Sequence, residues 1–82
     1  MSDEQLLQRI VSDPAIMTGK PVIRGTRLTV EYLLNLLAHG STVEEICGEY
    51  EGLEVDDLRA CLLFASHSIA RASFLPLLAE SV

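Results

Sequence analysis

The chain contains no tryptophan, only two cysteines and only six basic residues among its 82 residues. Two cysteines are too few for the disulfide framework of a small secreted domain, so we expect both thiols to be free. No apolar run approaches the roughly 20 residues of a membrane-spanning helix. The N-terminus also lacks the basic and apolar stretches of a signal peptide. These absences predict a cytoplasmic domain with no membrane contact.

The sequence also lacks residue patterns typical of metal sites or catalytic sites. His39 and His67 lie far apart in the sequence, and no cysteine or acidic residue stands at metal-ligand spacing from either. Nothing places a nucleophile beside a base, and a short helical chain offers little concave pocket. We therefore expect no catalytic residues, no metal and no cofactor, which leaves binding as the function to look for.

The chain is short and rich in apolar residues. At 82 residues it is expected to form one domain, residues 1–82, that buries only about 60–65 % of the surface its unfolded form exposes. Hydrophobic residues make up 49 % of the sequence, an excess typical of a chain that also buries an interface. Because small domains need an additional source of stability, we expect a homodimer.

The net charge of −6 is distributed unevenly. Residues 1–30 hold four basic and three acidic side chains, whereas residues 31–82 hold two basic and nine acidic ones. Binding to phosphates requires clustered lysine and arginine. Any contact with DNA is therefore expected to involve the first thirty residues.

Residues 30–74 have the periodicity of a helical core. The first predicted helix begins after Thr29, a good N-cap, and ends at Gly40, which favours the left-handed conformation after a helix C-terminus. Its inward stripe consists of Val30, Leu33, Leu34 and Leu37. This helix is the most strongly marked of the chain.

Two further helices are predicted after it. Ser41 and Glu44 have the spacing of a capping box, so the second helix is expected to begin after Ser41. After a break that contains Gly52, the third helix begins near Val55 and extends to about Ser73. The residues of the third helix expected to face inward are Leu58, Cys61, Leu62, Ala65 and Ile69.

Three helices joined by short glycine-containing breaks are typical of the trihelical helix-turn-helix, and the span Ser41 to Ala65 fits that plan best. Helix pairs with this spacing also occur in bundles that never contact DNA. The run Glu54 to Asp57 would repel phosphates at the start of a recognition helix, with Arg59 as the only basic residue in reach. We interpret this acidic run as solvated helix capping.

Residues 1–29 form an N-terminal arm of a different kind. Ser2 and Gln5 have the spacing of a capping box and predict a short helix. The expected strands are Val22–Ile23, Arg27–Thr29 and, as an alternative to a longer first helix, Ile10–Val11. The fold class is therefore mainly α, a trihelical core with an N-terminal arm that contains short β segments, followed by a short tail over residues 75–82.

The segment from Gly19 to Arg27 concentrates basic side chains on a constrained backbone. Its cations are Lys20, Arg24 and Arg27, and the residues that shape its backbone are Gly19, Pro21, Gly25 and Thr26. One hypothesis is that the cations bind phosphates or a partner's carboxylates, because guanidinium groups recognise both. The alternative, with equal weight, is that they pair with acidic helices of the same domain.

The sequence resembles the bacterial and archaeal family known as domain of unknown function 433 over roughly residues 9–66. The segments that carry the resemblance are Asp13-Pro14, Gly19-Lys-Pro-Val-Ile-Arg-Gly-Thr-Arg27, Leu28-Thr-Val30, Gly40-Ser41, Glu44-Glu-Ile46 and Tyr50. The resemblance implies a homeodomain-like helix-turn-helix with a β-arm, and an antitoxin role beside a small nuclease-like toxin of the PIN type. This chain departs from the family pattern at Glu51, where a proline is usual, and at Glu54, where Ser or Thr is usual.

We therefore predict an antitoxin-like binding protein that neutralises a partner toxin, with binding of its own promoter DNA as a dimer as a further expectation. The alternative is a protein-interaction or dimerisation module without DNA binding. The residues expected to contact the partner or DNA are Lys20, Arg24, Arg27 and Arg59.

Overall fold

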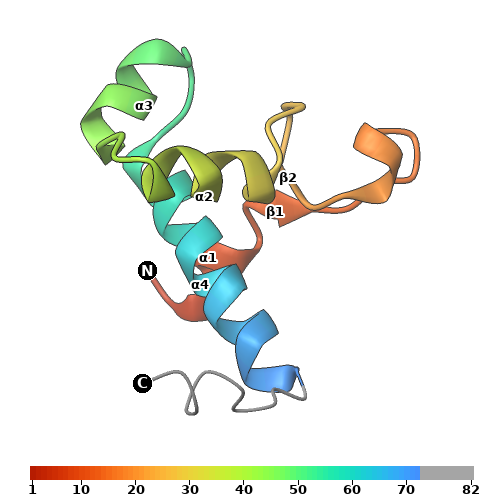
Figure 1. Ribbon diagram of the computed structural model, residues 1–82. Coiled ribbons are helices and arrows are strands. Elements are labelled where there is room, and N and C mark those ends of the chain that lie inside the picture. Colours follow the sequence, from red (N-terminus) through yellow and green to blue (C-terminus); the bar gives the residue numbers. More distant parts are fainter. Residues whose placement is uncertain (73–82) are drawn as a thin grey trace, which may run out of the picture.

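The protein is described by a computed structural model that covers residues 1–72 (Figure 1). Its elements are α1 (Asp3–Leu7), β1 (Ile10–Val11), the 3₁₀ turn η1 (Met17–Gly19), β2 (Val22–Ile23), α2 (Val30–Ala38), α3 (Val43–Glu49) and α4 (Val55–Arg71). The predicted class, mainly helical with short β segments in the arm, is confirmed. The predicted tail at residues 75–82 lies outside the described residues, and α4 ends at Arg71, just before the expected Ser73.

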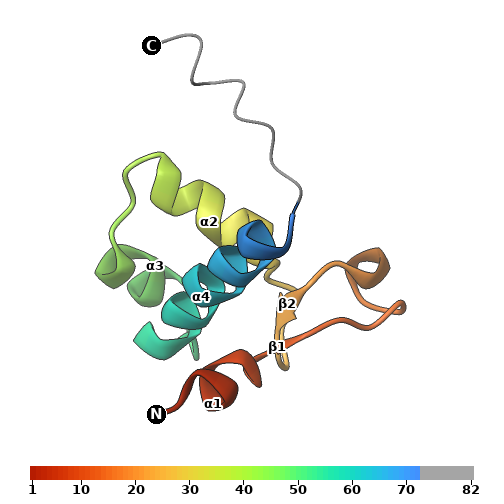
Figure 2. The same cartoon turned by 90° about the horizontal axis from the view of Figure 1, so that it is seen from below.

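Helix α4 forms the centre of the domain. Figure 2 shows it between α2 on one side and α1 on the other, with α3 close to its N-terminal half, and α4 contacts all three of these helices. The β1–β2 hairpin and η1 project sideways from the helices in both views. The arm therefore folds against the helical core at its strands, while its 3₁₀ turn extends outward.

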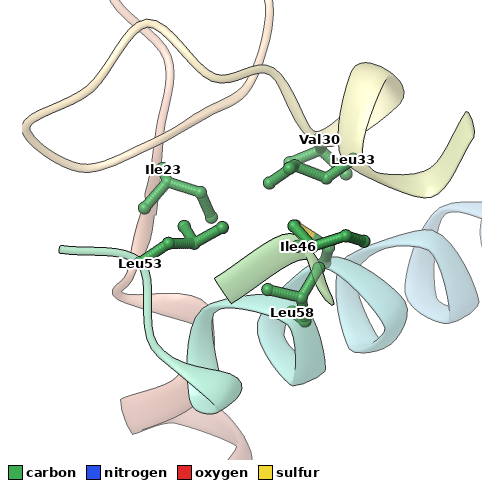
Figure 3. Packing of buried hydrophobic residues seen from close by; sticks show 7 residues of the cluster. Ile23, Val30, Leu33, Ile46, Leu53 and Leu58 are labelled. Atoms are coloured by element: carbon green, nitrogen blue, oxygen red, sulfur yellow. The ribbon is translucent and has the colours of Figure 1, made fainter. Parts of the chain in front are cut away.

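The arm and the three core helices share one hydrophobic core (Figure 3). Its buried members are Ile23, Val30, Leu33, Ile46, Leu53, Leu58 and Cys61. Val30 and Leu33 come from the predicted stripe of α2, and Leu58 and Cys61 come from the predicted inward face of α4. Because Ile23 belongs to β2, its burial in this cluster joins the arm to the helices.

Two residues of α4 that were expected to face inward are exposed. Leu62 is 51 % exposed and Ile69 is 66 % exposed. Leu62 lies beside α1, which has five residues and is too short to cover it. Ile69 lies further along α4, whose 17 residues extend about 26 Å compared with about 14 Å for α2. The prediction for these two positions was wrong because the neighbouring helices end too early to bury them.

The helix ends follow the predicted signals with one correction. Ser2 and Gln5 form the expected capping box, and Thr29 caps α2. The capping box of α3, however, is formed by Thr42 and Glu45 and not by Ser41 and Glu44. The backbone N–H of Ser41 donates to the carbonyl of Leu36 and still belongs to the C-terminal cap of α2, so α3 begins one residue later.

The arm is an antiparallel pair in which Ile10 lies opposite Ile23 and Val11 opposite Val22. The predicted strand Arg27–Thr29 does not form; a single bridge between Val22 and Thr29 takes its place. The edge of β2 is therefore paired within the chain. The outer edge of β1 has no backbone partner among residues 1–72, so it stays available for pairing with a second copy of the chain.

A tight turn built on Thr26 explains why that strand is absent. The Thr26 hydroxyl donates to the carbonyl of Ile23 at 2.8 Å and accepts the N–H of Leu28 at 3.0 Å. Gly25 beside it has a φ of 81°, which residues with a side chain rarely adopt. The glycine and the threonine of the motif thus reverse the chain between β2 and α2.

Alkaline pH is expected to destabilise the fold through Cys61. Burial raises the pKa of this thiol from 9.0 to about 12, and the charge of Asp57 adds to the effect. Between these values the unfolded chain binds fewer protons than the folded one, so the free energy of unfolding falls as the pH rises from about 9 toward 12. Urea unfolding at several pH values measures this decline, and it should be shallower for Cys61→Ala. Equal slopes for both proteins would contradict the assignment.

Candidate functional site

Arg9 connects the arm to the start of α4. Its Nη1 atom lies 2.8 Å from Glu54 Oε1 and 3.0 Å from Asp57 Oδ1, and these hydrogen bonds raise the pKa of the guanidinium. Asp57 is only 6 % exposed and also accepts the backbone N–H of Glu54 at 2.8 Å. The expected capping role of this run is confirmed, because Asp57 accepts the N–H of the N-cap residue Glu54. The expectation was wrong on two points: Asp57 is buried and not solvated, and Arg9 is in reach in addition to Arg59.

Arg24 also has an attachment within the domain. Its guanidinium donates to the carbonyl of Gln8, at 3.0 Å from Nε, and its backbone N–H donates to the carbonyl of Arg9 at 2.8 Å. These bonds tie the turn after β2 to the segment that follows α1. Of the two hypotheses for this cation, the contacts favour a role within the domain, because the Arg24 side chain joins two segments of the arm.

Lys20 and Arg27 line a common cleft, whose volume is about 540 Å³ and whose other walls include Tyr32, Asn35 and Tyr50. The Lys20 ammonium lies 3.2 Å from Glu31 Oε1, but both side chains are largely exposed and such a pair is weak. Arg27 has no carboxylate within salt-bridge distance among residues 1–72. Two of the four predicted cations therefore meet at one site.

Two tyrosines form one wall of this cleft. The hydroxyl groups of Tyr32 and Tyr50 lie 2.5 Å apart, and their rings meet edge to face with centroids 6.2 Å apart. The hydrogen bond with Tyr32 is the main reason that the pKa of Tyr50 rises to about 12. Tyr50 belongs to the segments that carry the family resemblance, whereas Tyr32, on the exposed side of α2, was not predicted as a site residue.

The turn η1 lies at the rim of the cleft in a strained conformation. Met17 and Thr18 have φ values of 48° and 54°, in the left-handed region that β-branched residues strongly resist. Each such residue costs on the order of 1–3 kcal/mol, so the surrounding structure has to impose the conformation. The Ser12 hydroxyl donates to the carbonyl of Gly19 and thereby closes the loop. The result is that Met17 lines the cleft beside Lys20.

An apolar groove of about 570 Å³ lies between α2 and α4. Its apolar lining consists mainly of Pro21, Val30, Leu34, Ala38, Phe64, Ala65 and Ile69. The groove and the cleft have Lys20, Thr29, Glu31 and Asn35 in common. The two hollows are therefore parts of one continuous surface, which we call the α2 surface.

The remaining predicted cation lies elsewhere. Arg59 is exposed on α4, where its Nη1 atom lies 3.1 Å from Asp56 Oδ1, and it borders a shallow hollow beside Leu6 and Leu62. The structure thus brings together Lys20 and Arg27 and separates Arg59 from both.

Within the part of the chain that is described, no helix is long and apolar enough to span a bilayer, and no three potential ligand side chains gather to hold a metal.

Together, these features define a small, mainly helical domain with a short N-terminal two-stranded hairpin. The chain belongs to the family described as Protein of unknown function (DUF433), whose sequence profile matches residues 10–65. The crystal structure of a DUF433 member protein from Anabaena variabilis is similar, with a TM-score of 0.72 and 29 % sequence identity over 83 % of this chain and 68 % of that one. A search among curated proteins found no match. The expected family membership is confirmed.

Proposed function

We propose that this protein binds and neutralises a partner protein, as an antitoxin does, and that the partner covers the α2 surface. The observation that carries the proposal is the continuity of the apolar groove with the polar cleft. An apolar centre beside a polar rim is the usual anatomy of a protein interface. Ile69, which is 66 % exposed at the groove, is the type of side chain that such a contact buries.

The antitoxin part of the proposal rests on what the family resemblance implies, namely a small nuclease-like toxin of the PIN type as the partner. The role is one of binding and not of catalysis. Association into a homodimer remains a prediction, which the exposed apolar residues of α4 support. A protein-interaction module without DNA binding is the alternative.

The surface charge gives less support to DNA binding. The start of α4, which would face base edges in a helix-turn-helix complex, carries Glu54, Asp56 and Asp57. These three carboxylates form ion pairs with two cations, Arg9 and Arg59, so the start of α4 keeps a net charge of −1. A negative helix terminus repels phosphates. Promoter binding therefore remains a prediction in which Lys20 and Arg27 would provide the contacts.

The proposal predicts that Ile69→Asp abolishes partner binding. A charge placed in the apolar groove would have to be desolvated when the partner covers it, which costs several kcal/mol. The test co-expresses this protein with the protein encoded by the adjacent gene, which the proposal expects to be a nuclease-like toxin, and measures growth and co-purification. The unaltered protein should form a complex and relieve growth arrest, whereas Ile69→Asp should do neither.

Leu62→Asp provides the matched control. Leu62 is an exposed aliphatic residue of the same helix, but it lies outside the groove, so its replacement should leave the complex intact. Circular dichroism of both variants checks that they fold. Failure of the unaltered protein to form the complex would refute the antitoxin role, and equal effects of both variants would refute the assignment to the α2 surface.

A further inference from the structure

We infer that the cleft at Arg27 binds a carboxylate group, contributed by an acidic side chain of the protein that covers the α2 surface. This inference rests on the proposed function, because it specifies the chemistry of the partner at one point of that surface. Arg27 and Lys20 come from the arm, Tyr32 and Asn35 from α2, and Tyr50 from the end of α3. The site therefore exists only where the arm is folded against the helices.

The charges at the cleft favour one negative charge. Lys20 and Glu31 lie 3.2 Å apart and largely cancel, while Arg27 has no carboxylate partner among residues 1–72. The net charge of the cleft is thus +1. When a partner covers this surface it removes water from the Arg27 guanidinium, and an unpaired charge in such a place is strongly unfavourable. A single carboxylate provides the missing charge, and its two oxygens fit the fork of a guanidinium group.

Neutral donors on the opposite wall complete the site. Of the two hydroxyl protons of Tyr32 and Tyr50, one is used in the hydrogen bond between them and the other is available for an acceptor. The side-chain amide of Asn35 supplies two further N–H groups at the same cleft. A carboxylate accepts several hydrogen bonds, so these groups can share its second oxygen and fix its orientation.

The surroundings favour a protein as the source of the carboxylate over a nucleic acid. The cleft continues directly into the apolar groove, where Lys20 is the only basic residue among residues 1–72 and is already paired with Glu31. Residues 31–82 carry nine acidic and two basic side chains, which repel a polyanion. Nucleic-acid binding needs several cations along a strand, whereas this cleft offers a net charge of +1.

The inference is tested by NMR titration of the isotopically labelled full chain with acetate, the simplest carboxylate probe. The Nε–Hε signal of Arg27 and the side-chain amide signal of Asn35 should shift and saturate. Saturation at Arg27 should occur at acetate concentrations at least about tenfold lower than at exposed Arg71, since a charge-assisted hydrogen bond in a formed site corresponds to that ratio. Inorganic phosphate and a short DNA duplex serve as the competing probes.

Two variants complete the test. Arg27→Gln should abolish the response of Asn35 to acetate, and Arg71→Gln, with the same change of charge, should preserve it. The backbone amide spectrum reports whether each variant is folded. An equal response of Arg27 and Arg71 would overturn the inference, as would tighter binding of phosphate or DNA than of acetate. Since partner binding is measured separately with Ile69→Asp, either failure leaves a positive result for the proposed function intact.

Discussion

Replacement of Leu58 by alanine is expected to lower the free energy of unfolding by about 3 kcal/mol. Leu58 is fully buried in the cluster to which the arm, α2, α3 and α4 all contribute (Figure 3). Removal of its branched end leaves a cavity bounded by several elements, which cannot all move inward together. Denaturant unfolding followed by circular dichroism measures the loss.

Leu62→Ala provides the control for this prediction. It makes the same chemical change one helical turn further along α4, at a position that is 51 % exposed. Its effect should stay below about 1 kcal/mol, because folding buries only part of the apolar surface of this side chain. If Leu62→Ala destabilised the protein as much as Leu58→Ala, the burial assigned to the two positions would be wrong.

Arg9→Gln is expected to lower the free energy of unfolding by about 2 kcal/mol, which is less than the 3–5 kcal/mol of a fully buried pair because Arg9 is one-quarter exposed. The substitution leaves the Asp57 carboxylate, which is 6 % exposed, without its cation. It also disconnects the arm from the start of α4. Thermal and denaturant unfolding should both report the loss.

A double variant separates the ion pair from other effects at this site. Asp57→Asn removes the buried charge, so Arg9→Gln combined with Asp57→Asn should be less destabilised than the sum of the single variants. Arg59→Gln is the matched control, since Arg59 contacts Asp56 at the surface and its loss should cost no more than about 0.5 kcal/mol. Additive single effects would show that Arg9 and Asp57 are not coupled.

Features that depend on neighbouring residues were predictable from the sequence. Ser2 with Gln5, Thr29 before α2 and the glycine at position 40 each act within one helical turn, and all three were found where expected. The start of α3 was displaced by one residue because two overlapping capping boxes were present. The cap of the preceding helix, which uses the N–H of Ser41, decided between them.

Features that depend on distant residues were not predictable. Arg9 and Asp57 are 48 positions apart, and nothing near either residue indicates the other. The exposure of Ile69 depends on how far the neighbouring helix α2 extends. The apolar periodicity of α4 gives no information about the length of another helix. For the candidate site, the sequence identified Lys20 and Arg27 by their charge. It did not identify Tyr32 or the left-handed turn at Met17. Both residues line the cleft only because the arm, α2 and the end of α3 come together in the folded domain.

The two strands of the arm have two residues each, and this shortness has a consequence for folding order. A ribbon of this size has little stability of its own and depends on the contacts that Val22, Ile23 and Arg9 make with the rest of the domain. We therefore expect the β1–β2 hairpin and the turn between its strands to open as one cooperative unit, below the energy of global unfolding, while α2, α3 and α4 remain folded. Because Lys20 lies within that unit and Arg27 directly after it, the cleft forms only while the unit is closed, and a bound carboxylate is expected to slow the exchange of the hairpin's amide hydrogens with solvent.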